Sequence, residues 1–197
     1  MKVLELFAGS CHFSKACKKA GHETFTVDIK QNPEGTVDLV KDIFYLKPED
    51  IPFKPDVVFS GTPCTTYSIA AISHHRNGIN AKSEFAKVCD EMNVIINAYI
   101  KMWDCIYFIE NPRGMLRKMP FMQGLPRVTI WYCQYGDDRA KPTDIWSNHI
   151  YDPMFNPNGW KPRPECWNGR EGCHESAPRG SKTGTQGKKD NYERSLY

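Results

Sequence analysis

The fold of this chain is decided around the stretch Asp56-Val57-Val58-Phe59-Ser60-Gly61-Thr62-Pro63-Cys64. The apolar residues 57–59 predict a strand, and the Gly-x-Pro sequence after them predicts a tight turn. The pair Pro63-Cys64 therefore indicates a thiol presented at a strand end, where it can act as a nucleophile. A cysteine buried in an ordinary turn is the alternative for this pair taken alone.

A second apolar run, residues 106–109, ends on Glu110-Asn111-Pro112. The carboxyl ends of parallel strands meet at one edge of a sheet, so a carboxylate, an amide and a thiol would emerge from neighbouring strand ends. This juxtaposition favours a catalytic site over a structural cysteine.

The N-terminus predicts a strand, a glycine turn and a helix. Residues 3–7 form a strand pattern, Gly9 interrupts it, and apolar residues then recur at helical spacing until Gly21. The next strand, 24–27, ends at Asp28, about 20 residues after the turn, where an acid binds ribose in dinucleotide-type folds.

Further along, Ser83 is the expected N-cap of a long amphipathic helix that ends near Trp103. Strands over 105–109 and 128–133 flank a helix-poor segment. This alternation predicts an α/β fold with a largely parallel sheet and helices on both faces. We expect a catalytic domain over residues 1–148 and a loop-rich appendage, rich in Pro, Gly and Cys and basic, over 149–197.

In their order, these landmarks resemble the DNA cytosine-C5 methyltransferase family, in its compact phage or prokaryotic form. The family has a Phe-x-Gly cofactor turn, an acidic strand end, a Pro-Cys nucleophile and a Glu-Asn pair, and this chain has Phe7-Ala8-Gly9, Asp28, Pro63-Cys64 and Glu110-Asn111 in the same order. The resemblance implies a Rossmann-like, S-adenosylmethionine-dependent methyltransferase fold that methylates C5 of a flipped-out cytosine in DNA.

The chemistry of that reaction explains the residue types. Cytosine C5 is a poor nucleophile until a thiolate adds to C6, and Cys64 is the candidate for that addition. A carboxylic acid of raised pKa at N3 stabilises the charge pushed into the ring, and Glu110 fits this role, with Asn111 fixing the geometry of the strand end.

For the cofactor, S-adenosylmethionine, the resemblance implies contacts from the turn, from acids for the ribose and adenine, and from the nucleophile turn. Cys11 stands in the place of the family's second glycine. The implied cofactor-binding residues are Phe7, Ala8, Gly9, Asp28, Ile29, Asp42, Ile43 and Pro63.

Two further segments acquire roles from the resemblance. Arg139 and Lys141 replace a glutamine-arginine pattern whose basic side chains hold the flipped base and its phosphate, and a solvated loop is the alternative. Residues 69–81 occupy the position of a mobile loop that closes over the base, and an ordinary exposed loop is the alternative.

The formal charge of +3 is too small to indicate nucleic-acid binding by itself, but residues 176–189 hold four basic residues and no acid. That segment is either a solvated tail or a strap along a phosphate backbone. The 8 cysteines are scattered through apolar segments, which predicts reduced thiols. With no signal-peptide or membrane-span pattern, we expect a cytoplasmic protein of a bacterium or a phage-infected cell.

Cys166, Cys173 and His174, with Cys133 or His149, allow a structural zinc, although their spacing does not match the usual zinc patterns, so no metal site is predicted. DNA is the expected partner, without a membrane, and a separate chain could provide sequence specificity. A related pyrimidine-modifying enzyme with another substrate and a non-catalytic DNA-binding relative stay open as alternative functions.

Overall fold

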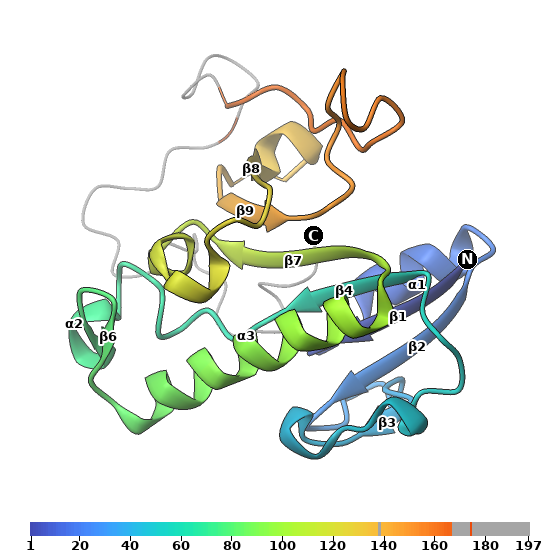
Figure 1. Ribbon diagram of the computed structural model, residues 1–197, viewed down its shortest axis with the longest axis horizontal. Coiled ribbons are helices and arrows are strands. Elements are labelled where there is room, and N and C mark those ends of the chain that lie inside the picture. Colours follow the sequence, from blue (N-terminus) through green and yellow to red (C-terminus); the bar gives the residue numbers. More distant parts are fainter. Residues whose placement is uncertain (138, 167–173, 175–197) are drawn as a thin grey trace.

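The computed structural model describes residues 1–137, 139–166 and 174. Its central feature is a seven-stranded sheet with the order β3-β2-β1-β4-β7-β9-β8 (Figure 1). Neighbouring strands from β3 to β7 run parallel, whereas β9 is antiparallel to both β7 and β8. The prediction of a largely parallel sheet is therefore confirmed. The strands of this sheet are β1 (Lys2–Leu6), β2 (Glu23–Asp28), β3 (Leu39–Val40), β4 (Val57–Gly61), β7 (Ile106–Pro112), β8 (Arg127–Trp131) and β9 (Pro142–Trp146).

Helices cover both faces of the sheet, as predicted. The helix α1 (His12–Lys19) connects β1 to β2, and α3 (Glu84–Trp103) lies between β4 and β7. The two connections step along the sheet in opposite directions, so right-handed crossovers place their helices on opposite faces. Figure 1 shows α3 across the near face and α1 behind the sheet.

The helix α3 begins where the sequence predicted. The Ser83 hydroxyl accepts a hydrogen bond from the Ala86 N–H at 3.1 Å, which satisfies one of the free donors of the first turn. Its buried face, including Cys89, Ile96 and Ile100, packs into the same core as the inner strands. The remaining connections contain short 3-10 turns: η1 (Ile43–Tyr45), η2 (Pro48–Asp50), η3 (Met115–Lys118), η4 (Pro120–Met122) and η5 (Tyr132–Tyr135).

The start of α1 is capped from a neighbouring strand. Its N-cap, Cys11, provides no side-chain hydrogen bond. The buried carboxylate of Glu5 in β1 instead accepts the Ser14 N–H at 2.8 Å. This bond fixes the beginning of the helix to the strand that precedes it.

The strand β9 was not predicted from the sequence, because it begins at a proline and carries Asp144 at its centre. Asp144 is fully buried and accepts hydrogen bonds from the Arg117 and Arg127 guanidinium groups and from the Thr129 hydroxyl. A buried carboxylate with this many donors is stable inside a sheet. The partners of Asp144 lie 15 to 27 residues away in the sequence, so the local pattern around Asp144 did not predict a strand.

Residues 69–81 form an anchored element consisting of α2 (Ile72–His75), β5 (Arg76–Asn77) and β6 (Asn80–Ala81). The Arg76 side chain is buried, pairs with Asp90 of α3 at 2.6 Å and donates to the Thr66 carbonyl at 2.9 Å. Its guanidinium carbon also lies 4.4 Å from the centre of the Tyr67 ring. This arrangement ties the segment to α3 and to the turn that follows Cys64.

After β9 the chain continues through bridges between Ile150 and Trp160 and between Asp152 and Asn156. The Trp160 ring packs edge-on against Phe108 of β7, with ring centres 6.0 Å apart. Among the described residues, the model contains no helix with the length and apolar character needed to cross a membrane.

The Arg76–Asp90 pair yields a stability prediction. Replacing Arg76 with Met removes the cationic partner of the Asp90 carboxylate and a donor to the Thr66 carbonyl, so Arg76→Met should lower the free energy of unfolding by about 3 kcal/mol. The control is Lys87→Met, because Lys87 pairs with the exposed Glu84 on the same helix, and a change within about 0.5 kcal/mol is expected there. Urea unfolding measures both, and equal effects would contradict the anchoring role of Arg76.

Candidate functional site

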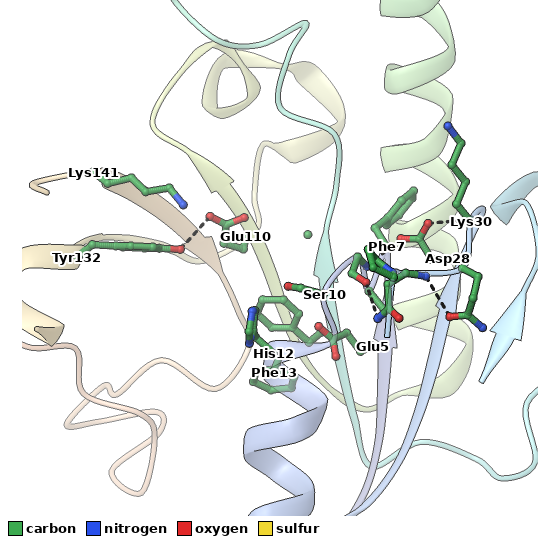
Figure 2. Close-up of a pocket in the computed structure, with 17 residues that line it drawn as sticks. Glu5, Phe7, Ser10, His12, Phe13, Asp28, Lys30, Glu110, Tyr132 and Lys141 are labelled. Atoms are coloured by element: carbon green, nitrogen blue, oxygen red, sulfur yellow. Dashed lines mark hydrogen bonds between the residues drawn. The ribbon is translucent and has the colours of Figure 1, made fainter. Parts of the chain in front are cut away.

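A cavity of about 620 Å³ opens at the carboxyl edge of the parallel strands. This volume lies within the range of pockets that hold small molecules and cofactors. Figure 2 shows Glu110, Tyr132 and Lys141 gathered on one side of it, and Phe7, Asp28 and Lys30 on the other. The predicted site residues that line the cavity are Phe7, Ala8, Gly9, Asp28, Glu110 and Lys141.

The glycine turn after β1 forms one wall. Phe7, Gly9 and Cys11 all have positive φ angles, 56°, 49° and 57°. Cys11 therefore adopts the backbone conformation that suits the family's second glycine, although it is not a glycine. Its buried side chain packs with Ala8 and Val37. Cys11 thus takes part in a turn with a left-handed backbone in spite of its side chain.

Asp28 holds the turn against the end of β2. Its carboxylate accepts the Gly9 N–H and the Lys30 N–H, each at 2.9 Å. A carboxylate has further lone pairs on both oxygens, so these bonds leave acceptor capacity for the hydroxyls of a ribose. Ile29, the next residue, is 56% exposed and offers an apolar surface beside it. The acceptor capacity of Asp28 at this wall suits the ribose of a nucleoside.

Asn32 is a residue of this wall that the sequence analysis missed. Its side-chain amide donates to the Gly9 carbonyl at 3.1 Å and to the Thr36 hydroxyl at 2.7 Å, which joins the loop after β2 to the glycine turn. The Asn-Pro pair at 32–33 was a visible turn signal, but its contact with Gly9 spans 23 residues and could not be inferred.

Asp42 and Ile43 lie outside the lining of the cavity. The Asp42 carboxylate caps η1 by accepting the Phe44 N–H at 3.1 Å, and Ile43 is buried in the main hydrophobic core. These contacts give both residues a structural task. Their predicted contacts with adenine stay a prediction.

The turn that carries Pro63 and Cys64 is held from two sides. The Cys64 carbonyl accepts the Tyr67 and Ser68 N–H groups at 3.0 Å, which closes the chain into a compact turn. The buried amide of Asn111 donates to the Thr62 carbonyl at 3.0 Å. Asn111 therefore fixes the turn that carries Cys64 directly, in addition to its place next to Glu110.

Tyr67 fastens the same turn to the protein interior. It is fully buried, and its hydroxyl donates to Asp90 at 2.7 Å. Its carbonyl accepts the Met115 N–H at 2.8 Å, and a Cβ at Gly114 would lie only 2.4 Å from that carbonyl oxygen. The segment after Glu110 and the segment after Cys64 thus pack backbone to backbone.

Glu110 projects into the cavity from β7, opposite Gly61 of β4 in the strand register. The Tyr132 hydroxyl donates to its Oε1 at 3.4 Å, and the Lys141 Nζ lies 4.3 Å from the centre of the Tyr132 ring. Burial raises the pKa of Glu110, and Lys141 and Tyr132 offset only part of that rise. Glu110 therefore binds a proton more readily than an exposed glutamate does.

Burial is also the largest cause of the pKa shifts of Lys141 and Tyr132, the two neighbours of Glu110. It lowers the pKa of Lys141, and Glu110 and Cys64 act in the opposite direction by favouring the ammonium. It raises the pKa of Tyr132, which therefore keeps its proton and serves as a hydrogen-bond donor. Lys141 is thus electrostatically coupled to both predicted catalytic groups. The sequence analysis assigned no role to Tyr132, because only the fold brings it to Glu110.

Arg139 is buried, and its guanidinium group donates to Asp137 at 2.8 and 2.5 Å. The Asp137 carboxylate thereby neutralises the charge of the Arg139 guanidinium, which was predicted to contact the flipped base or its phosphate. Lys141, with its Nζ at the cavity, is the basic residue of this segment that the structure places at the site. Outside the lining of the cavity lie the predicted residues Ile29, Asp42, Ile43, Pro63, Cys64, Asn111 and Arg139.

Comparison with known proteins identifies the fold. The S. pombe Dnmt2 methyltransferase superposes with a TM-score of 0.51 at 14% identity, covering 75% of this chain and 48% of that chain. This chain has the Rossmann-like fold of S-adenosylmethionine-dependent methyltransferases.

Two other solved structures are similar with lower scores. A mutant form of Spodoptera frugiperda DNMT2 superposes with a TM-score of 0.48 at 16% identity, covering 80% of this chain and 53% of that chain. A SAM-dependent methyltransferase of Agrobacterium tumefaciens superposes with a TM-score of 0.40 at 14% identity, covering 75% of this chain and 56% of that chain. The chain thus spans about half the length of these structures. No family model and no curated protein matches the sequence.

The predicted basic strap, 176–189, and Cys173 lie outside the described residues.

The raised pKa of Glu110 predicts a pH-dependent effect on stability. An acid whose pKa is raised by folding stabilises the protein fully below its unfolded pKa of about 4.5, and this contribution is lost as the pH rises through the folded pKa. Glutamine cannot ionise, so Glu110→Gln should gain stability relative to the natural protein as the pH rises from about 4 to about 8. Urea unfolding across that range measures the difference.

The control for this experiment is Glu91→Gln on the exposed face of α3, which removes one carboxylate without removing a buried one. A difference between Glu110→Gln and the natural protein that does not change with pH, or that shrinks as the pH rises, would contradict the buried environment of Glu110.

Proposed function

We propose that this protein is an S-adenosylmethionine-dependent methyltransferase that methylates C5 of a flipped-out cytosine in DNA. The observation that carries the proposal is the arrangement of two strand ends. Cys64 follows β4 and Glu110 projects from β7, and these strands are adjacent, with Gly61 paired to Glu110. The methyltransferase fold supports the first half of the proposal, and the residue types at these two positions support the second.

In this mechanism the thiolate of Cys64 forms a bond to C6 of the base, and the electron pair of the C5–C6 double bond moves into the ring. Glu110, whose pKa is raised by burial, donates its hydrogen bond or proton to N3 and stabilises that charge. C5 then carries enamine character and accepts the methyl group. Loss of the C5 proton and departure of the thiolate restore the ring.

Lys141 has two tasks in the proposal. Its charge favours the thiolate form of Cys64, since the two groups attract each other. It is also placed to donate to the base where the family uses basic side chains. Tyr132 donates to Glu110 and holds the carboxyl group in position. S-adenosylmethionine, bound at the Gly9 turn with its ribose near Asp28, would supply the methyl group as a sulfonium.

DNA as the substrate, and a separate chain that supplies sequence specificity, belong to the proposal as its partners. The two alternative functions have distinct signatures. Mass spectrometry of the product would identify another pyrimidine modification by its mass. A non-catalytic DNA-binding relative would bind DNA without turning over the cofactor, which a cofactor-binding titration combined with a methyl-transfer assay would reveal.

The role of Cys64 is tested with DNA that contains 5-fluorocytosine. Fluorine at C5 cannot leave as a proton does, so the C6 adduct should accumulate as a covalent protein–DNA complex in the presence of cofactor. Cys64→Ser should abolish both the complex and turnover, because the hydroxyl is a far weaker nucleophile. Cys17→Ser, a half-buried thiol of α1, is the matched control and should retain both. Normal turnover by Cys64→Ser would remove the proposed mechanism.

The role of Glu110 is tested by single-turnover kinetics. Glu110→Gln retains the shape of the side chain but cannot transfer a proton, so methyl transfer should slow by roughly 10²- to 10⁴-fold, the contribution of one general acid. Binding of S-adenosylmethionine should be unchanged. A change confined to cofactor affinity would instead assign Glu110 to the cofactor site.

A further inference from the structure

Three metal-ligand side chains, far apart in the sequence, meet beside η5. They are Cys133 of η5, Cys166 and His174, and their ligand atoms all lie within 4.8 Å of one another. The Cys166 Sγ is 3.4 Å from the His174 Nδ1. All three residues are partly buried. The arrangement is separate from the cavity, whose lining includes none of them.

These distances are close to those of a metal site. A tetrahedral zinc ion with Zn–S bonds of about 2.3 Å and a Zn–N bond of about 2.0 Å separates its ligand atoms by about 3.4 to 3.8 Å. The cluster needs only small side-chain rotations to reach that geometry. Two thiolates and an imidazole form a soft ligand set that favours zinc over magnesium or calcium.

An independent set of contacts holds the ligands together. Arg163, three residues before Cys166, donates from its guanidinium group to the Gln134 carbonyl at 2.6 Å and from its backbone N–H to the Tyr135 hydroxyl at 2.9 Å. Its guanidinium carbon lies 5.0 Å from the centre of the Tyr135 ring. The segment that carries Cys166 is therefore docked on η5 next to Cys133 by contacts that do not involve the cluster.

We propose that Cys133, Cys166 and His174 bind a zinc ion that fastens the C-terminal segment to η5. The sequence analysis named these three residues among the possible zinc ligands but did not favour a metal site, because their spacing is irregular and the first ligand is 33 residues from the second. η5 begins with Tyr132, the residue that donates to Glu110. The metal would thus rigidify the turn behind the candidate active site while staying outside it. The proposal does not depend on the methyltransferase reaction.

The test uses the full chain, loaded with zinc and dialysed extensively against metal-free buffer. About one zinc per chain should remain by elemental mass spectrometry. Replacement with Co²⁺ should produce an absorption band for thiolate-to-metal charge transfer and the visible bands of tetrahedral cobalt. Cys133→Ser, Cys166→Ser and His174→Ala should each weaken Co²⁺ binding at least tenfold, and Cys17→Ser should leave it unchanged.

The spectrum of the natural chain decides the proposal even if a variant fails to fold. A chain that retains no zinc and gives no thiolate–cobalt band would overturn it. Peptide mapping of the purified natural chain without reductant that finds Cys133 and Cys166 joined in a disulfide would also overturn it, because neither sulfur could then bind the metal as a thiolate. Equal Co²⁺ affinity in Cys166→Ser and Cys17→Ser would do the same.

Discussion

The burial of one carboxyl group, that of Glu110, governs the candidate site. In a solvated position the acid would be ionised at neutral pH, whereas here the desolvation that raises its pKa also lowers that of Lys141. Each charge offsets only part of the shift of the other, so both half-buried groups have pKa values displaced toward their neutral forms. A carboxyl group in this environment binds a proton more readily than an exposed glutamate does, which suits a general acid.

Two other buried charged groups of the fold, Asp144 and Arg76, have several close partners. Asp144 is buried beside the site in the next strand, but it receives two guanidinium groups and a hydroxyl. Arg76 is equally buried and has a carboxylate and backbone carbonyls as partners. The contrast between these groups and Glu110 distinguishes a structural buried charge from a candidate catalytic one, since Glu110 lines the cavity and has a raised pKa, whereas Asp144 and Arg76 lie outside the cavity lining.

Local patterns predicted the inner half of the sheet well, because its strands are apolar on both sides and end in glycine, proline or an acid. The Ser83 cap and the long helix behind it were also predictable, since both signals lie within a few residues. The strand β9 was not, because Asp144 is stable there only through partners 15 to 27 residues away. The sequence likewise predicted one shared role for Arg139 and Lys141 as basic side chains at the base. In the structure Arg139 pairs with Asp137, whereas Lys141 lines the cavity.

The same distinction between local and distant signals explains the site. Gly9 and Asp28 were recognisable by residue type and spacing, and the structure joins them by a hydrogen bond. Tyr132 and Asn32 were not recognisable, because each acts through a contact formed only after the sheet is assembled. Asn111 is a third case. Its place at the strand end was predicted, but only the structure shows its hydrogen bond to the Thr62 carbonyl, which orients the turn of Cys64. The amide of one strand thus positions the turn of the proposed nucleophile after the next, so a change in the separation of β4 and β7 would displace Cys64 and Glu110 together.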